Sequence, residues 1–333
     1  MPCVTLYGTT LAWSGEGLSR DPLAELLSFL APPAASGPAT IHFTLRLAGP
    51  GAELDPATEG FVPSFFHGIV QAYAAADDGF LLWDHASRIH VPLDGSPIVA
   101  SLVSPDREPI AGSTAVMLQI ALTLALRREH LFHLHAAAVI HRSGAGVLVV
   151  GGSGAGKTTT TLALLEAGYA YLVDDCLFLR RLPTSAQIDV LAFPREFHLG
   201  PATLKAFPRL AALAGPLSAR ADKRPVDPRA AYPDRARAAW TPVKGAALAV
   251  FPVVTDDAET TLSPIPKAEA FGHLLTSSAA LVIDGIPNRD ENLAMLRELL
   301  ELASCRELRL GRDALIDPRG VVADRLEREI QRG

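Results

Sequence analysis

The first hundred residues contain short runs in which apolar and polar positions alternate. An opening strand and a short helix near Leu23 to Leu30 come first, followed by Ile41 to Leu47 and several runs between Ile69 and Val103. Turn sequences such as Asp94-Gly95-Ser96 separate these runs, and alternation with period two between turns predicts β-hairpins. We expect residues 1–108 to form a smaller, β-rich α+β domain. It carries no catalytic signature, which leaves acceptor recognition or simple packing as its roles.

A different pattern begins after the proline-containing linker Pro105 to Pro109. Ser113 has the chemistry of an N-cap, and the segment from there to Arg128 is apolar almost all round, which predicts a buried helix. From Leu131 onward the order is strand, glycine turn, strand, glycine-rich loop, helix, strand. That order is typical of an α/β domain built on a central sheet. We therefore expect residues 109–333 to form the catalytic domain.

The segment 215–243 interrupts this domain with five prolines among many basic residues. Prolines disfavour regular structure, so the segment is predicted to be a mobile basic loop. Either its cations close over bound phosphates or it is an ordinary solvated linker. Strands near 246–254 and 260–263 and helices near 267–277, 288–303 and 321–331 would then complete a sheet covered on both faces. The basic residues are Arg220, Lys223, Arg224, Arg229, Arg235 and Arg237.

Composition narrows the functional classes. With 333 residues, 49% hydrophobic and 20% charged, the chain is large enough for two globular domains. A formal net charge of −6 argues against a general nucleic-acid binder, because binding to a phosphate backbone needs clustered Lys and Arg. The three cysteines show no metal-ligand or CxxC spacing, and neither a signal-peptide pattern nor a membrane-spanning segment is present. These features predict a cytoplasmic protein with no nucleic-acid or membrane partner.

The clearest motif is Gly151-Gly-Ser-Gly-Ala-Gly-Lys-Thr158, which satisfies G-x-x-x-x-G-K-[ST] in full. It follows the β-type run Val147 to Val150 and precedes a helical segment that ends at Gly168. In such a loop the backbone N–H groups bind phosphates, the lysine neutralises the β and γ phosphates and the hydroxyl coordinates Mg²⁺. A chance glycine turn is the alternative, and the flanking strand and helix argue against it. The predicted nucleotide-binding residues are Gly151, Gly152, Ser153, Gly154, Ala155, Gly156, Lys157, Thr158 and Thr159.

Two aspartates end the next predicted strand, Tyr171-Leu-Val-Asp174-Asp175. A helix of about ten residues rises roughly 15 Å away from the loop, and an adjacent strand running back returns its end to the phosphates. Neighbouring strand residues point to opposite faces, so the two carboxylates should differ in role. One would accept the proton of an attacking hydroxyl, and the other would hold metal or water. Alternatively, both are solvated aspartates at a strand end.

The segment His133-Leu-His135 begins a strand that turns back into the strand before the glycine-rich loop. This pairing places a histidine near the loop, where a catalytic role is one interpretation. A hydrogen-bonded structural histidine is the other interpretation, and it is the commoner role of a lone histidine.

This part of the chain resembles the catalytic domain of the HPr kinase/phosphorylase family in the order, and nearly in the spacing, of five features. They are His135, the glycine-containing hairpin, the strand Val147 to Val150, the loop Gly151 to Thr158 and the Asp174-Asp175 pair. The match covers about Leu131 to Leu179. The resemblance implies a P-loop kinase domain of the HPr kinase/PEP-carboxykinase-like type that uses ATP and Mg²⁺. It implies that Lys157 and the loop amides bind phosphates, Thr158 takes the place of a serine at Mg²⁺, Asp174 is the catalytic base, Asp175 assists metal binding and His135 lies on the γ-phosphate side.

The chain also departs from this family. The hairpin after His135 is longer, and the glycine-rich I-R-G-x-G stretch that contributes to the phosphorylase reaction is missing. Phe193-Pro-Arg195-Glu196 stands in about that place, so Glu196 is a candidate second Mg²⁺ ligand and Arg195 a candidate phosphate clamp. An exposed ion pair is the alternative. Arg224 is a further candidate for nucleotide binding, and the departures favour a kinase without phosphorolysis.

The chain looks most like kinases that phosphorylate the C-terminal serine of lasso-peptide precursors. The resemblance lies in chain length, the added N-terminal region, the Leu-His-Ala-Ala-Ala segment and Leu-Gly-Arg-Asp313. The expected function is an ATP- and Mg²⁺-dependent serine kinase whose partner is a peptide or small protein, and a homo-oligomer is compatible with the family. The alternatives are a small-metabolite kinase and a nucleotide-sensing binding protein without turnover. An ABC-type ATPase is disfavoured because the chain has no downstream serine-glycine-glycine signature loop.

Overall fold

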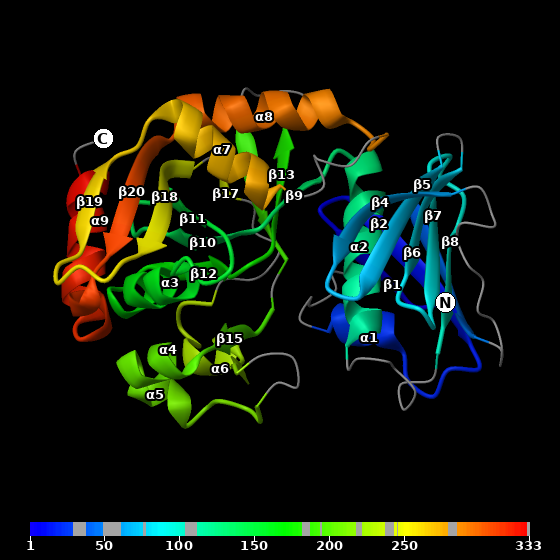
Figure 1. Cartoon of the computed structure of the whole chain (residues 1–333), viewed down its shortest axis with the longest axis horizontal. Helices are drawn as coiled ribbons and strands as arrows, with labels where there is room; N and C mark the ends of the chain where they lie inside the picture. Colours follow the sequence, from blue (N-terminus) through cyan, green and yellow to red (C-terminus); the bar gives the residue numbers. More distant parts are fainter. Residues whose placement is uncertain are drawn as a thin grey trace. The chain divides into compact units, whose positions relative to one another are not determined.

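The computed structural model consists of two compact units. One contains Met1–Leu131 and Ala280–Arg289, and the other contains Phe132–Ala279 and Asp290–Gly333 (Figure 1). The structure describes residues 1–28, 38–48, 61–75, 78–103, 112–181, 187–193, 195–217, 222–236, 243–244, 246–278 and 285–331.

The first unit is built on an eight-stranded sheet with the order β1-β2-β3-β8-β7-β6-β5-β4. Strand β2 is parallel to β3, and β3 to β8, while the other neighbours are antiparallel. Ile41, Phe43 and Leu45 alternate along β3 and are buried, so the period-two pattern reflects a buried sheet face. The strands are β1 (Cys3–Leu6), β2 (Thr9–Glu16), β3 (Ile41–Leu47), β4 (Val62–His67), β5 (Val70–Ala75), β6 (Gly79–Trp83), β7 (Arg88–Pro92) and β8 (Ile98–Leu102).

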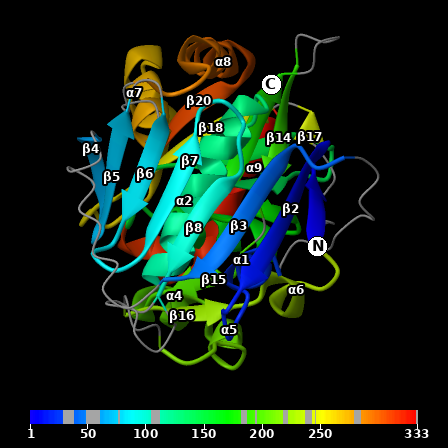
Figure 2. The same cartoon turned by 90° about the vertical axis from the view of Figure 1, so that its right-hand side faces the viewer.

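Helix α2 (Ser113–Arg128) packs against β5, β6 and β7 and against the short helix α1 (Pro22–Leu26). Figure 2 shows the strands of this sheet with α2 behind them. The helix begins after Gly112, so Ser113 is its first residue and not its N-cap. As its apolar pattern predicted, the helix is largely buried.

The boundary between the units differs from the expected division after residue 108. Helix α2 belongs to the first unit, and the chain returns to that unit at 280–289. Nε of the buried Arg127 donates to the Pro287 carbonyl over 3.2 Å, and Asn288 Nδ2 donates to the Arg127 carbonyl over 2.9 Å. A helix that is apolar on all sides carries no signal for which sheet it covers. A contact with a segment so much later in the chain leaves no local pattern either.

The second unit contains a six-stranded sheet with the order β12-β10-β11-β18-β20-β19. Its centre, β11-β18-β20, is parallel, while β10, β12 and β19 are antiparallel to their neighbours. A four-stranded antiparallel sheet, β17-β14-β13-β9, and the pair β15-β16 also belong to this unit. The strands are β9 (Phe132–Leu134), β10 (Ala136–Ile140), β11 (Gly146–Val150), β12 (Ala170–Val173), β13 (Leu177–Arg181), β14 (Ile188–Ala192), β15 (Phe197–Leu199), β16 (Arg224–Val226), β17 (Val243–Lys244), β18 (Ala246–Val254), β19 (Thr261–Pro264) and β20 (Ser304–Leu310).

Helices cover both faces of the six-stranded sheet, as expected. Helix α3 (Lys157–Glu166) lies against β10 and β11, and its Leu162 shares a buried core with Leu248 and Leu308 of the sheet. By strand alternation Phe251 points to the opposite face, where its ring centre is 5.5 Å from that of His273 on α7 (Lys267–Ser277). No helix in the described ranges is long and apolar enough to span a membrane. Further elements are α4 (Pro201–Ala206), α5 (Pro208–Ala211), α6 (Pro228–Ala231), α8 (Arg289–Leu302), α9 (Asp324–Ile330), η4 (Arg312–Leu315) and η5 (Arg319–Ala323).

The basic segment 215–243 contains more regular structure than its prolines suggested. Strand β16 and helix α6 lie within it, so the expectation of an irregular loop is wrong for residues 224–231. Pro228 is at the start of α6, where a missing N–H is tolerated because it would have no partner in the helix. Asp227 caps this helix by accepting a hydrogen bond from the Arg229 N–H over 2.8 Å. Residues 218–221 and 237–242 lie outside the described residues.

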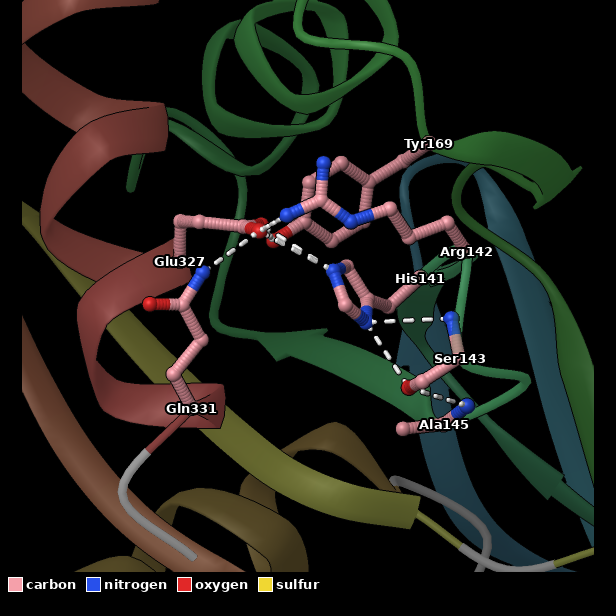
Figure 3. Close-up of polar contacts among 7 residues, drawn as sticks. All are labelled: His141, Arg142, Ser143, Ala145, Tyr169, Glu327 and Gln331. Carbon is pink, nitrogen blue, oxygen red and sulfur yellow. Dashed lines mark hydrogen bonds and ion pairs between the residues drawn. The ribbon is translucent and has the colours of Figure 1, made fainter.

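A polar cluster joins the C-terminal helix α9 to the β10–β11 hairpin (Figure 3). Glu327 of α9 accepts hydrogen bonds from the Tyr169 hydroxyl over 2.8 Å and from Gln331 Nε2 over 3.1 Å. Its carboxylate also lies 3.1 Å from His141 Nε2 and forms an ion pair with Arg142 in the hairpin turn. One carboxylate therefore connects α9, the hairpin that leads into the glycine-rich loop and the turn after α3.

Candidate active site

The glycine-rich loop joins β11 to α3, as the sequence predicted. The loop follows Val150 and α3 begins at Lys157. Gly154 and Gly156 have φ angles of 81° and 104°, in the left-handed region that residues with a side chain rarely adopt. A Cβ at Gly156 would also lie 2.3 Å from Leu310 Cδ1. The backbone of the loop therefore depends on glycine at position 156.

The loop presents backbone N–H groups that have no internal partners. Gly156 is the N-cap of α3, and no side chain caps this helix. Within the described part of the chain, the N–H groups of Gly154, Gly156 and Lys157 make no hydrogen bond. Free N–H groups at a helix N-terminus attract anions. The segment Gly151–Thr159 thus has the donors that a bound phosphate needs.

Lys157 is the first residue of α3, and its side chain is buried. Its Nζ donates to the carbonyl oxygens of Gly151 at 2.8 Å and Gly152 at 3.2 Å, and lies 2.9 Å from His135 Nε2. An ammonium group has no lone pair, so the contact with His135 is a hydrogen bond only when the ring proton is on Nδ1. Burial lowers the pKa of Lys157, and the charge of Asp175 partly offsets this effect.

Asp174 directly follows β12 and is only 3% exposed. Thr158 Oγ1 donates to its Oδ2 over 3.0 Å, and the Asp174 N–H donates to the Tyr171 hydroxyl over 2.9 Å. The other carboxylate oxygen, Oδ1, is buried without a hydrogen-bond partner among the described residues. Burial, followed by the charge of Asp175, raises the pKa of Asp174 to about 7. The Thr158 hydrogen bond and the charges of Lys157 and Lys223 oppose this rise.

Asp175 has different surroundings from its neighbour. Its φ angle of 75° turns the chain after β12, and its side chain is 51% exposed. Asp175 Oδ1 lies 3.3 Å from His135 Nε2 and 3.6 Å from Lys157 Nζ. The structure therefore brings His135, Lys157 and both aspartates together, with one carboxylate buried and the other in reach of solvent. His133 lies apart from this group and packs its ring 5.7 Å from that of Phe178.

The residues of the loop suit the phosphates of a nucleotide, but they supply only some of the ligands that Mg²⁺ needs. The free amides and Lys157 suit phosphate oxygens, and the unpaired Oδ1 of Asp174 suits a hydroxyl donor. No group of three His, Cys, Asp or Glu in the described ranges is arranged to hold a metal by itself. A Mg²⁺ ion at Thr158 and Asp175 would therefore need phosphate oxygens and water among its ligands, as is usual for Mg²⁺ beside phosphates.

Arg224, a predicted nucleotide-binding residue, makes contacts of another kind. Its Nε donates to the Gly215 carbonyl over 2.8 Å, and its NH2 group donates to the Ala214 carbonyl over 2.6 Å. Through these contacts the guanidinium stabilises the turn at Ala214 and Gly215, where the basic segment begins. The predicted phosphate contact of Arg224 stays a prediction beside these contacts.

The charges of Arg195 and Glu196 both act on His198 of β15. The guanidinium carbon of Arg195 lies 5.9 Å from the centre of the Phe193 ring. Burial lowers the pKa of His198, and the charges of Glu196 and Asp175 raise it. Glu196 makes no hydrogen bond or ion pair within the described part of the chain. Its predicted role as a metal ligand stays a prediction.

Two supporting residues were missed in the sequence. In the sequence Tyr171 is one residue of an apolar strand, yet in the structure its hydroxyl accepts the Asp174 N–H. Thr203 of α4 places its Oγ1 3.4 Å from that of Thr159, which joins α4 to the first turn of α3. A tyrosine three residues before an aspartate is a weak local signal. The threonine pair has none, because it depends on the path of the chain between the two helices.

Comparison with known proteins gives no family assignment. No family model matches the chain, and no curated protein matches it. Among solved structures, the chain is similar to the Hpr(Ser) kinase/phosphatase from Coxiella burnetii, with 12% identity, coverage of 59% of this chain and 98% of that chain, and a TM-score of 0.27. A likeness this weak leaves the case for function to the site itself. The chain is a mixed α/β protein with several sheets and a P-loop sequence.

Proposed function

We propose that the chain is an ATP- and Mg²⁺-dependent serine kinase that acts on a peptide or small protein. The observation that carries this proposal is the buried Asp174 carboxylate beside the glycine-rich loop. One of its oxygens is held by Thr158, and the other has no partner among the described residues. A carboxylate in this position can orient an acceptor hydroxyl and take its proton.

The loop residues would bind and orient the phosphates. ATP supplies the phosphoryl group, and Mg²⁺ offsets the charge on its oxygens. The free N–H groups of Gly154 and Gly156 and the α3 N-terminus would hold phosphate oxygens. Lys157 Nζ now donates to the carbonyls of Gly151 and Gly152 and would exchange these acceptors for the more strongly charged phosphate oxygens.

Asp174 is suited to act as the base. Burial brings its pKa to about 7, so its carboxylate takes up a proton more readily than an ordinary aspartate at neutral pH. Thr158 and Tyr171 fix its side chain and backbone. His135 and Asp175 would orient Lys157 on the exposed side, and Asp175 and Thr158 would contribute oxygens to Mg²⁺.

The finer proposal is that the acceptor is the C-terminal serine of a lasso-peptide precursor. Its support is the sequence resemblance, and one part of that resemblance has a structural role. Asp313 accepts hydrogen bonds from the Thr260 N–H at 2.9 Å and from Thr260 Oγ1 at 2.6 Å. The Leu-Gly-Arg-Asp313 segment therefore stabilises the fold and does not identify a substrate.

Mass spectrometry tests the proposed function directly. Purified protein would be incubated with ATP, Mg²⁺ and three acceptors: HPr, peptides that end in serine, and free serine. Lys157→Ala is the control, because it removes the charge that binds the β and γ phosphates. We expect one or more phosphate groups on a peptide or on HPr, and none with the variant.

Two other results would contradict the proposal in different ways. Phosphorylation of free serine alone would identify a small-metabolite kinase. Tight ATP binding with no modified acceptor would identify a nucleotide-sensing protein. Because both results keep ATP binding, a parallel measurement of ATP affinity separates them from failure of the site itself.

A further inference from the structure

The short β15–β16 pair is attached to the candidate active site from two sides. Its register places Leu199 opposite Arg224. Phe197 of β15 has its ring centre 5.1 Å from that of Tyr171, whose hydroxyl holds the Asp174 N–H. Helix α4 follows β15 and contacts α3 through the Thr203–Thr159 pair. Residues at the start of β16 are therefore tied both to the strand that carries Asp174 and to the helix that begins with Lys157.

The Arg224 guanidinium is engaged by the Ala214–Gly215 turn. It donates to the carbonyls of Ala214 and Gly215, and the Gly215 N–H donates back to the Pro225 carbonyl over 2.8 Å. Lys223 directly precedes Arg224 and makes none of these contacts with the Ala214–Gly215 turn.

The charge of Lys223 affects the pKa of three groups in or beside the site. Burial has the largest influence on the pKa of Asp174, Lys157 and His198, and the Lys223 ammonium lowers the pKa of all three. Lys223 is half-buried and has no hydrogen-bond or ion-pair partner among the described residues. An ammonium group with no partner among the described residues can donate charge-assisted hydrogen bonds to an anion beside it. Arg229 in the same segment is different, because it is exposed and paired with Asp227 at 2.9 Å.

We propose that Lys223 binds the γ-phosphate in this site, held in position by the Arg224 contacts. This inference rests on the proposed function and adds a second cation to Lys157. The ammonium would donate hydrogen bonds to the non-bridging oxygens of the phosphoryl group. It forms no covalent bond, and it would stabilise the negative charge on those oxygens during transfer.

The test compares the affinities for ATP and ADP in the presence of Mg²⁺, because only ATP carries the γ-phosphate. Lys223→Met keeps the aliphatic stem and removes the charge. We expect it to weaken ATP binding by about ten- to hundredfold, the loss typical of one charge-assisted hydrogen bond, with ADP affinity nearly unchanged. Lys223→Arg should restore most of the preference for ATP, and Arg229→Met should bind both nucleotides like the wild type.

The outcomes separate this inference from the proposed function. If Lys223→Met binds and transfers phosphate like the wild type, Lys223 has no role and the inference fails alone. Equal losses of ATP and ADP affinity would show a structural effect and would also overturn it. If the wild type itself binds no ATP, the proposed function and this inference fall together. Circular dichroism of each variant confirms that the fold is kept.

Discussion

At the scale of single residues, the candidate site depends on two adjacent aspartates with different surroundings. Asp174 is buried and hydrogen-bonded to Thr158, whereas the Asp175 side chain is half exposed beside His135 and Lys157. A buried carboxylate is the stronger base, since low polarity disfavours its charged form. An exposed carboxylate keeps its charge more easily and is better suited to share a cation with phosphates. Their positions support different chemical roles.

The first prediction concerns Asp174→Asn. The amide keeps the shape of the side chain and can still accept from Thr158, but it cannot take a proton. We expect the rate of phosphate transfer to fall by about 10²- to 10⁴-fold, the usual contribution of a general base. ATP affinity should change little. Single-turnover kinetics and direct binding measurements on the same preparation check both parts.

Asp175→Asn is the matched comparison for this prediction. It removes a charge near Lys157 and the expected metal, so it should raise the Mg²⁺ concentration needed for half-maximal activity. Full phosphate transfer by Asp174→Asn would exclude Asp174 as the base. An identical response of the two variants would show that the aspartates do not have separate roles.

The residues whose meeting could be predicted from the sequence are those that lie close together along the chain. Lys157, Thr158 and Asp174 lie within one strand–loop–helix–strand stretch, so their order along the chain already predicts that they meet. Arg224 and Lys223 could not be told apart in the same way. The contacts of Arg224 depend on the pairing of β16 with β15 and on the Gly215 turn. Neither contact leaves a pattern in the sequence.

At the scale of secondary-structure elements, Glu327 anchors α9 to the hairpin that leads into the glycine-rich loop (Figure 3). Burial raises the pKa of Glu327. Hydrogen bonds from Tyr169 and His141 and the charges of His141 and Arg142 lower it by more, so the pKa of Glu327 lies below its ordinary 4.5. The unfolded chain therefore takes up this proton at a higher pH than the folded chain. The stabilisation is complete above about pH 4.5 and is lost as the pH falls through the folded pKa.

The second prediction is that Glu327→Gln flattens the acid limb of the stability curve. Wild-type Tm should fall as the pH drops below about 4.5, because protonation of Glu327 weakens its contacts. The variant should have a lower Tm at neutral pH and a shallower slope in this acid range. Thermal unfolding followed by circular dichroism measures both. Parallel curves for the two proteins would mean that other carboxylates cause the acid sensitivity.

The third prediction concerns Gly311, between β20 and η4. Its φ and ψ of −79° and −178° suit any residue, but a Cβ there would lie 2.5 Å from the Glu259 carbonyl carbon. That atom belongs to the backbone and cannot move aside easily. Gly311→Ala should therefore lower the free energy of unfolding by about 1–3 kcal/mol, as overpacking usually does. Denaturant unfolding measures the loss.

Gly200 provides the control for this effect. Its φ and ψ of −76° and 167° are nearly those of Gly311, but nothing lies within 4 Å of its Cβ position. Gly200→Ala should leave the stability almost unchanged. Similar losses in the two variants would show that backbone freedom, and not close approach, decides the effect at Gly311.

At the scale of the whole molecule, the sequence predicted the two kinds of architecture better than their boundary. Alternation in strands such as β3 and the order of elements after Leu131 are local patterns, and both appear in the structure. The boundary depends on α2 and on the return of 280–289 to the first unit. These are long-range contacts of Arg127 with Pro287 and Asn288, which no window of sequence contains.

The fourth prediction uses this division into units. All the described residues of the candidate site, from His135 to Lys223, belong to the second unit. ATP with Mg²⁺ at about a hundred times the Kd stabilises the state that binds it by about 2.7 kcal/mol. Amides whose exchange requires opening of the second unit should then exchange about a hundredfold more slowly. Hydrogen-exchange mass spectrometry should find this protection around α3, β12 and 222–226, and not within residues 1–103.

Adding an acceptor to the ATP complex distinguishes the two possible roles of the first unit, which are acceptor recognition and packing alone. If that unit recognises the acceptor, a serine-ended peptide added to the ATP complex of Asp174→Asn should protect amides there, because slow transfer keeps the peptide unmodified. If the first unit only packs on the second, new protection should stay near Asp174 and β15–β16. Lys157→Ala, which should bind no ATP, distinguishes nucleotide-dependent protection from direct peptide binding. Protection of the first unit by ATP alone would contradict a nucleotide site confined to the second.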